Sequence, residues 1–218
     1  MIRFDIADAK DFLRSLNDNS VDLMITDAAY ESLEKHRKKG TTTRLKKSKA
    51  SSNEWFDVVP NSYFEEFFHL SFQKMKINSH LYFFCDQETM FAVKPMAEAA
   101  GFTFWKPIVW DKKKIGMGYH YRARYEFILF FEKGKRKLNN LGIPDVLEVP
   151  RVINGYPTEK PVELCEILIN QSSNPGDYVV DPFVGSGSVA IASIRTKRHF
   201  SGCDINADAI QLCLKRTE

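Results

Sequence analysis

Short apolar runs alternate along this chain with amphipathic stretches. Runs rich in aromatic and β-branched residues are typical of buried strands, whereas a 3.6-residue apolar period is typical of helices. The expected strands are Ile2–Ile6, Val21–Thr26, His80–Cys85, Phe102–Trp110, Tyr125–Phe131, Tyr178–Val180 and His199–Cys203. The expected helices are Ala9–Leu16, Ser62–Lys76, Gln87–Ala100, Pro161–Ser172, Ser186–Thr196 and Ala207–Lys215. This alternation predicts an α/β fold with a doubly wound, mostly parallel sheet of seven strands.

Two segments interrupt the alternation. Residues 35–53 contain no acidic residue but eight Lys or Arg among Gly, Thr and Ser, which predicts a basic surface loop. Residues 133–156 carry a second basic cluster followed by Asn-Asn, Gly and Pro with little periodicity, which indicates a surface insertion or linker. We expect residues 1–218 to form one domain, because a chain of this length can bury a single α/β core.

Composition narrows the class of protein further. Hydrophobic residues make up 44% of the chain and aromatic residues 13%, which is typical of a globular fold. The four cysteines, Cys85, Cys165, Cys203 and Cys213, are scattered in apolar stretches, so we expect buried thiols in a reducing compartment. No apolar run approaches the ~20 residues of a membrane span, and no CxxC or HxxxH spacing occurs. We therefore expect a cytoplasmic protein without a metal site.

A glycine-rich turn, DPFVGSGS, occupies Asp181–Ser188 between an expected strand and an expected helix. Glycines let the backbone approach a ligand closely, and the N–H groups of the following helix suit a polar or anionic group. Asp204 ends the next strand, where a carboxylate can accept hydrogen bonds from the ribose hydroxyls of an adenosine-containing cofactor. The glycines also fit the dinucleotide fingerprint, so an NAD-dependent oxidoreductase is an alternative. Asp181 would repel a pyrophosphate but could hold an ammonium group, which favours a sulfonium cofactor with a methionine moiety over NAD.

With these motifs, the chain resembles the β-class DNA amino-methyltransferases, which make N6-methyladenine or N4-methylcytosine. In that class a D/S-P-P-Y/F motif precedes the D-P-F-x-G-S-G motif, a circular permutation of the usual order. This chain reads VDLMITDAAY at Val21–Tyr30, YPTEKP at Tyr156–Pro161 and DPFVGSGS at Asp181–Ser188. Shorter matches are Ile6-Ala-Asp8, Trp110-Asp-Lys112, Arg124-Tyr-Glu126-Phe and Gly202-Cys-Asp204. The resemblance covers most of the 218 residues.

The resemblance implies a Rossmann-like methyltransferase fold that binds S-adenosyl-L-methionine and methylates an amino group of a flipped base in double-stranded DNA. The catalytic residues that it implies are Asp27, Ala28, Ala29 and Tyr30. The cofactor-binding residues that it implies are Asp8, Asp27, Thr158, Lys160, Asp181, Phe183, Gly185, Ser186, Gly187, Ser188 and Asp204. For Asp8, Thr158 and Lys160, capping of the helix that follows is an alternative role. A bacterial or phage origin and a possible homodimer stay open.

The tetrapeptide Asp27–Tyr30 departs from the family pattern. In the family's mechanism the Asp carboxylate and a backbone carbonyl accept the two amino hydrogens of the base, and the aromatic ring stacks on it. Ala28 and Ala29 replace the two prolines, which fix φ and lack an N–H donor. We therefore expect impaired activity, through either a deliberate substitution or natural decay into a DNA-binding pseudoenzyme. Asp at the first position implies adenine rather than cytosine, and the absence of a Pro-Cys dipeptide disfavours cytosine-C5 chemistry.

Basic residues follow the tetrapeptide directly, so we expect them to lie beside the flipped base and the nearby phosphates. The expected DNA-binding residues are Lys35, Arg37, Lys38, Lys39, Arg44, Lys46, Lys47, Lys49, Arg122 and Arg124. Lys112–Lys114 and Lys133–Lys137 could extend this basic face, and residues 133–156 could form a recognition insertion. A solvated surface without a ligand is the alternative for every such charge run. Tyr119 or Tyr121 could either stack on bases or pack in the core.

Overall fold

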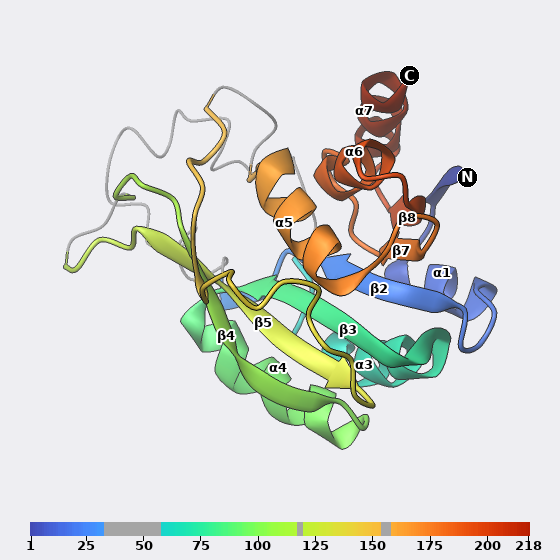
Figure 1. The fold of residues 1–218 in the computed structure, drawn as a ribbon, viewed down its shortest axis with the longest axis horizontal. Helices are drawn as coiled ribbons and strands as arrows, with labels where there is room; N and C mark the ends of the chain where they lie inside the picture. Colours follow the sequence, from blue (N-terminus) through green and yellow to red (C-terminus); the bar gives the residue numbers. More distant parts are fainter. Residues whose placement is uncertain (33–57, 117–119, 154–157) are drawn as a thin grey trace.

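The computed structural model describes residues 1–32, 58–116, 120–153 and 158–218. Its centre is an eight-stranded sheet in the order β1-β8-β7-β2-β3-β5-β4-β6 (Figure 1). The strands are β1 (Ile2–Ile6), β2 (Val21–Thr26), β3 (Met75–Cys85), β4 (Thr103–Asp111), β5 (Tyr125–Lys133), β6 (Val146–Glu148), β7 (Tyr178–Asp181) and β8 (His199–Asp204). Strand β5 runs antiparallel to β3 and β4, and the other neighbouring pairs are parallel. The predicted α/β class and mostly parallel sheet are confirmed.

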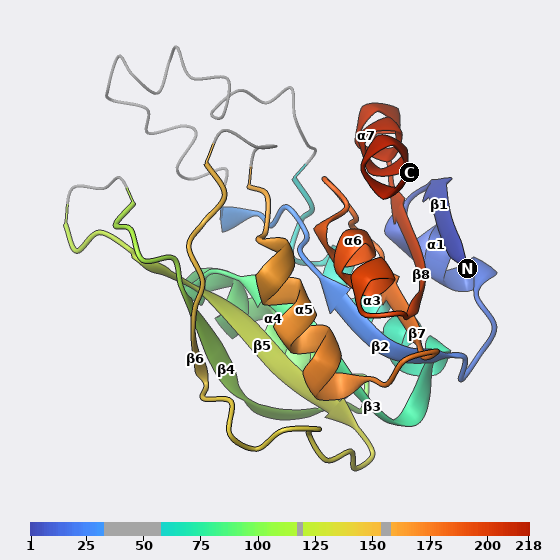
Figure 2. The ribbon, with the colours of Figure 1, turned by 45° about the horizontal axis from the view of Figure 1, so that its top comes forward.

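Helices cover both faces of the sheet, as Figure 2 shows. The helices are α1 (Ala9–Ser15), α3 (Tyr63–Lys74), α4 (Gln87–Ala99), α5 (Val162–Ser172), α6 (Ser188–Arg195) and α7 (Ala207–Thr217). Helices α1, α3 and α4 pack with Met24 and Phe83 on one face, and α5, α6 and α7 pack with Leu23 and Tyr82 on the other. Neighbouring strand residues point to opposite faces, so the continuous apolar runs of β2 and β3 supply both layers.

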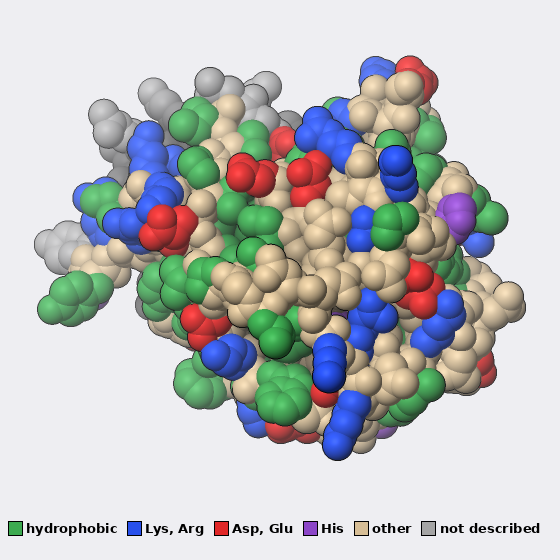
Figure 3. All heavy atoms as spheres, in the orientation of Figure 1, with side chains coloured by type: hydrophobic (Ala, Val, Ile, Leu, Met, Phe, Trp, Pro, Cys, Tyr) green, Lys and Arg blue, Asp and Glu red, His purple; other side chains and the backbone are tan. Residues whose placement is uncertain are grey.

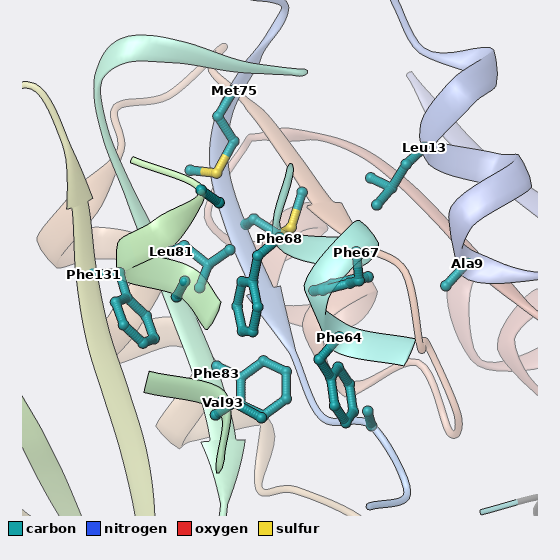
Figure 4. Close-up of a cluster of buried hydrophobic side chains, with 14 of the residues drawn as sticks. Ala9, Leu13, Phe64, Phe67, Phe68, Met75, Leu81, Phe83, Val93 and Phe131 are labelled. Carbon is teal, nitrogen blue, oxygen red and sulfur yellow. The ribbon is translucent and has the colours of Figure 1, made fainter. Parts of the chain in front are cut away.

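Phenylalanines dominate the core between α3 and the sheet (Figure 4). Phe64, Phe67 and Phe68 lie three and four positions apart on α3, which places them on one face of the helix, and all three are fully buried. The ring of Phe64 meets that of Phe83 on β3 edge to face, with centroids 5.3 Å apart. Such pairs stabilise the fold by about 0.5–1.5 kcal/mol beyond the area that they bury.

The prediction of seven strands is wrong by one, because β6 lies within the predicted insertion 133–156. Strand β6 pairs in parallel with the edge strand β4. Leu147 and Val149 are buried there, and the indole N–H of Trp110 donates a hydrogen bond to the carbonyl of Val149 over 2.7 Å. A three-residue strand carries no measurable period, so only its pairing partner reveals it. The circular permutation of the motif order stays a prediction from the resemblance.

Other expectations about element ends and buried groups have mixed outcomes. Strand β3 begins at Met75 rather than at His80, because α3 ends at Lys74 and not at Lys76. The four cysteines are buried and free, as predicted. Lys133 does not extend a basic face, since its ammonium is buried and donates to the carbonyls of Phe72 and Met75 over 2.6 Å each. None of the helices in the described ranges is long and apolar enough to cross a membrane.

Candidate functional site

Acidic side chains stand in a row where neighbouring parallel strands end. Asp204 is the last residue of β8, Asp181 is the last residue of β7, and Asp27 directly follows β2. Asp8 comes two residues after β1, at the N-cap of α1. In open α/β sheets, ligands bind outside the carboxyl ends of the strands. The strand order β1-β8-β7-β2 therefore brings together four carboxylates that are far apart in the sequence.

The glycine-rich turn after β7 is joined to the end of β8. The backbone N–H of Gly185 donates to one oxygen of Asp204 over 3.1 Å, and the N–H of Asn206 donates to the other oxygen over 2.9 Å. Gly187 begins α6 in the left-handed conformation with φ 82°, and a Cβ there would meet the sulfur of Cys213 at 3.0 Å. Glycine at this position therefore sets the path of the turn, and Asp204 holds the turn against the neighbouring strand.

Asp8 has the helix-capping role that the sequence offered as an alternative, and it also lines the site. Its carboxylate accepts the N–H of Lys10 over 2.8 Å and the hydroxyl of Tyr63 over 2.9 Å. Thr158 and Lys160 do not cap the next helix through a side chain, since α5 has Pro161 at its N-cap without a side-chain hydrogen bond. Thr158 has φ 63°, which is unusual for a β-branched residue and turns the chain sharply before Lys160.

Lys160 lies among acidic groups. Its ammonium donates a hydrogen bond to Oδ2 of Asp27 and lies 3.2 Å from Oε1 of Glu126. The ammonium of Lys112 lies 2.7 Å from the other oxygen of Glu126. Two lysines and two carboxylates thus alternate along the wall of the site, so that their formal charges cancel. Lys160 is 8% exposed, and a buried ammonium requires such partners.

The tetrapeptide lies at one end of the same site. Ala28 and Tyr30 are buried, and Tyr30 pairs with Val59 through an isolated parallel bridge. The N–H of Val59 donates to the carbonyl of Ala29 over 2.7 Å. The side chain of Asp27 is 26% exposed. Asp27 therefore faces the site from the end of β2 and can accept a hydrogen bond from a ligand.

A cleft of about 700 Å³ connects these groups, a size within the usual range of small-molecule sites. It is lined by all four tetrapeptide residues and by ten of the expected cofactor-binding residues, namely Asp8, Asp27, Thr158, Lys160, Asp181, Phe183, Gly185, Ser186, Ser188 and Asp204. Gly187 is the expected residue that does not line the cleft. Across the described ranges, no three His, Cys, Asp or Glu side chains are arranged to hold a metal ion.

Several lining residues were absent from the sequence-based site. Among them are Tyr63, Phe84, Trp110, Lys112, Glu126 and Asn206. Trp110, Lys112 and Glu126 do lie in the shorter motifs quoted above, Trp110-Asp-Lys112 and Arg124-Tyr-Glu126-Phe. Their presence in these motifs was the signal that the sequence offered for a place in the site. The motifs alone do not indicate what each side chain does.

Burial changes the acid–base behaviour of the site. Burial raises the pKa of Asp181 to about 8, because the residue is only 3% exposed; the backbone N–H of Phe183 donates a hydrogen bond to its carboxyl group over 3.0 Å and opposes the rise. Burial also raises the pKa of Asp27 to about 6, with Lys160 opposing the rise and Glu126 adding to it. The pKa of Asp204 is raised as well, again chiefly by burial. Each of these carboxyl groups is thus poised to respond to a bound cation or hydrogen-bond donor.

The expected DNA-binding residues fall into two groups. Lys35, Arg37, Lys38, Lys39, Arg44, Lys46, Lys47 and Lys49 lie outside the described residues. Arg122 and Arg124 lie before β5, where both are exposed. Arg124 forms a two-point ion pair with Asp111 at 2.5 and 2.7 Å, and Arg122 donates to the carbonyl of Gly116 over 2.8 Å.

Charged side chains of both signs gather over the ends of β4 and β5, next to the grey residues in Figure 3. Lys112 and Lys113 pair with Glu126 and Glu148, so part of the predicted basic face is neutralised within the protein. Tyr119 lies outside the described residues, and Tyr121 is fully exposed and does not belong to the core. Of the two roles considered, core packing is thus wrong for Tyr121.

Comparison with known proteins gives one family and a consistent fold. A model of the family described as DNA methylase, N6_N4_Mtase, matches residues 21–215. Type II methyltransferase M.HhaII of Haemophilus parahaemolyticus is 28% identical over 204 residues, which cover 89% of this chain and 87% of that protein.

The fold of this chain is similar to that of solved structures over nearly its whole length. The crystal structure of the M1.HpyAVI-SAM complex has a TM-score of 0.73 and 24% identity, covering 99% of this chain and 100% of that one. The cytosine-N4-specific PvuII DNA methyltransferase has a TM-score of 0.75 and 18% identity, covering 100% of this chain and 86% of that one. At these identities the likeness shows a shared fold.

Proposed function

Because the chain belongs to the DNA methylase family N6_N4_Mtase, we propose that it transfers a methyl group from S-adenosyl-L-methionine to the exocyclic amino group of a base in DNA. One observation carries the proposal: Asp27 and Tyr30 of the tetrapeptide open onto the same cleft as the glycine-rich turn and Asp204. Groups that can hold an amino base and groups that can hold an adenosine-containing cofactor thus share one space. An NAD-dependent oxidoreductase is the less favoured alternative, because both the family and the acidic side chains of the cleft favour S-adenosylmethionine over NAD.

The residues of the cleft fit the chemistry of this cofactor. Each oxygen of Asp204 accepts one backbone N–H and keeps a lone pair for a ribose hydroxyl. Asp181 is a buried carboxyl group that gains most from a cationic partner, as the ammonium of a methionine moiety would be. Phe183, Ser186 and Ser188 line the same cleft. When bound there, S-adenosylmethionine supplies an electrophilic methyl group on its sulfonium.

On the base side, Asp27 and the adjacent backbone supply hydrogen-bond acceptors. The amino nitrogen of a base is a weak nucleophile, because its lone pair is delocalised into the ring. An ionised Asp27 and a carbonyl of the tetrapeptide can accept its two hydrogens and aim the lone pair into the cleft. Tyr30 lines the same end of the cleft, where an aromatic face offsets part of the cost of unstacking a flipped base.

We propose adenine N6 as the target atom, on the ground that Asp stands first in the tetrapeptide. Family members with Asp at this position act mainly on adenine, and those with Ser act mainly on cytosine. The fold is shared with the cytosine-N4-specific PvuII enzyme, so the fold itself does not decide the base. The acceptor side chain at position 27 is the feature that bears on this choice.

We also propose that Ala28 and Ala29 weaken this form of the enzyme. Alanine has a free φ angle and an additional N–H donor where the family has proline, so the turn between Asp27 and Tyr30 loses stiffness. Binding of cofactor and of DNA uses other groups and should persist. A DNA-binding pseudoenzyme is the limiting case, in which transfer is lost and binding remains.

Product analysis tests the proposal. Plasmid DNA is incubated with labelled S-adenosylmethionine and either this protein or its Ala28→Pro/Ala29→Pro variant, and the digested nucleosides are separated by mass spectrometry. We expect label in N6-methyldeoxyadenosine; label in N4-methyldeoxycytidine would overturn the choice of base. Calorimetry with S-adenosylmethionine and with NAD provides the second measurement. Tight binding of NAD without a response to S-adenosylmethionine would overturn the proposed function.

A further inference from the structure

Lys160 has contacts that a cofactor-binding role does not explain. Its ammonium donates a hydrogen bond to Asp27, the first residue of the tetrapeptide, and lies 3.2 Å from Glu126. Its next contact is the carbonyl of Thr158 at 3.4 Å, and it lies 5.2 Å from the centre of the Phe84 ring. An ammonium has three donors, and these partners account for all of them.

We propose that Lys160 is a positioning residue for Asp27: it fixes one carboxylate oxygen and leaves the other for the amino group of the target base. Glu126 holds Lys160 in place, and Lys112 neutralises Glu126. This inference rests on the proposed function, since it assigns Asp27 to the base. It changes the assigned role of Lys160 from binding the cofactor to positioning the residue that binds the target base.

The geometry of the bonds supports this division of labour. Lys160 donates to Oδ2 of Asp27, and no described residue donates to Oδ1. Asp27 stays 26% exposed, whereas the side chain of Lys160 is 9% exposed and that of Glu126 is 12% exposed. The lysine and the glutamate thus form a buried support, and the aspartate is the member of the group that reaches the cleft.

The charges explain why the support needs both signs. Asp27 and Glu126 both approach the ammonium of Lys160, so two carboxylates would face each other without it. Glu126 raises the pKa of Asp27, because a second negative charge in one site favours the protonated form, and a protonated carboxyl group is a poor acceptor for an amino hydrogen. Lys160 therefore keeps Asp27 ionised as well as oriented.

Other titratable groups that face Asp27 carry little charge near neutral pH. Burial raises the pKa of Asp181 on β7 to about 8, so this carboxyl group is largely protonated at pH 7. Burial likewise raises the pKa of Tyr30, of Cys85 at the end of β3 and of Cys165 on α5, and all three stay neutral. Burial is the largest cause of the raised pKa of Asp27; among the charged neighbours, Lys160 lowers this pKa, Glu126 raises it, and Lys112 makes a smaller contribution.

The test measures the titration of Asp27 directly. The protein is labelled with ¹³C at the aspartate carboxyl carbons, the Asp27 signal is assigned with Asp27→Asn, and its pKa is followed by NMR. We expect Lys160→Met to raise this pKa by at least about one unit and Glu126→Gln to lower it, because the first removes a stabilising cation and the second a repelling anion. The double variant should return the pKa toward the wild-type value. Lys74→Met is the matched control, because Lys74 is equally buried, 8% exposed, but pairs with Asp18 away from the cleft.

Activity and cofactor binding complete the test. In the proline-restored protein, the acid limb of the kcat profile should move to higher pH with Lys160→Met and to lower pH with Glu126→Gln. Affinity for S-adenosylmethionine should change less than about threefold, a few tenths of the free energy of one charged hydrogen bond. If Lys160→Met does not fold, two variants still test the inference. Glu126→Gln should lower the pKa of Asp27, and the double variant should return this pKa toward the wild-type value.

Two results would overturn the inference. One is a pKa of Asp27 that is the same in wild type, Lys160→Met and Glu126→Gln. The other is a loss of S-adenosylmethionine affinity of tenfold or more in Lys160→Met with an unchanged titration, which would return Lys160 to the cofactor side. A different pattern separates the two proposals: if the pKa values shift as expected but no variant methylates DNA, the support of Asp27 stands and the proposed function falls.

Discussion

The backbone N–H of Val59 donates a hydrogen bond to the carbonyl oxygen of Ala29 over 2.7 Å. This bond ties the tetrapeptide to the start of the segment that leads into α3. It uses one of the two lone pairs of the Ala29 carbonyl, whereas no described backbone N–H donates to the carbonyl of Ala28. No described residue accepts a hydrogen bond from the N–H of Ala28 or Ala29.

Restoring Ala28→Pro and Ala29→Pro should raise the rate of methyl transfer by at least ~100-fold, the scale expected when a misaligned reactive geometry is corrected. The substitutions remove two N–H groups that are not used by the described residues, and the bond from Val59 survives because it uses a carbonyl. The measurement is transfer of labelled methyl groups to duplex DNA at saturating cofactor. The gain should appear in kcat rather than in cofactor or DNA affinity. Full activity of the alanine form would contradict this account of the prolines.

Asp204→Ala should weaken binding of S-adenosylmethionine by about 1.5–3 kcal/mol, the range for charge-assisted hydrogen bonds to a partly buried group. The substitution also releases the N–H groups of Gly185 and Asn206, which loosens the glycine-rich turn. Calorimetry gives the affinity, and Asp208→Ala is the control because Asp208 is exposed in the first turn of α7. Equal affinities in the wild type and in Asp204→Ala would show that Asp204 merely ends a strand.

Binding of S-adenosylmethionine at pH 7 should release close to one proton from Asp181. The pKa of Asp181 is about 8 in the free protein, so the group is mostly protonated at pH 7, and a cationic partner favours its ionised form. Affinity should accordingly increase as the pH rises from 6 toward 8 and then level off. Calorimetry in buffers of different ionisation enthalpy measures the proton count. Asp181→Asn should abolish this release; an identical count in that variant would assign the proton elsewhere.

Lys46→Glu with Lys47→Glu should weaken binding to duplex DNA while leaving the affinity for S-adenosylmethionine nearly unchanged. Both lysines lie in the basic segment 35–53, outside the described residues. If each contacts a phosphate, the dependence of log K on log salt should become shallower by roughly one unit per contact. A salt titration of DNA affinity checks this. Unchanged affinity and slope would favour a solvated surface without a ligand.

Phe67→Ala should lower the free energy of unfolding by about 3–5 kcal/mol, because a fully buried ring is replaced by a cavity. Phe91→Ala makes the same chemical change at a position that is 76% exposed and should have a small effect. Denaturant unfolding of both variants provides the comparison. A similar loss in the two would mean that the cluster around α3 is not a close-packed core.

The sequence by itself determined most of the fold. The aromatic and β-branched runs of β2 and β5 and the spacing of apolar residues on α3 and α5 are local patterns, and local patterns govern which element a segment forms. The glycine-rich turn and Asp204 were likewise visible, because their roles depend on residues that lie next to the ends of strands. These features could be predicted without knowing which residues lie beside them in the folded protein.

Only the tertiary structure decided the roles that depend on partners distant in the chain. Strand β6 forms because it pairs with the edge strand β4, and its three residues are too few to predict a strand from their pattern. Lys160 fitted a helix cap or a cofactor contact from its neighbours in sequence, yet its partner Asp27 lies 133 positions away. Glu126 had no assigned role until β5 brought it to the same ammonium. A buried charge takes its function from the groups that surround it, and only the folded sheet determines which groups those are.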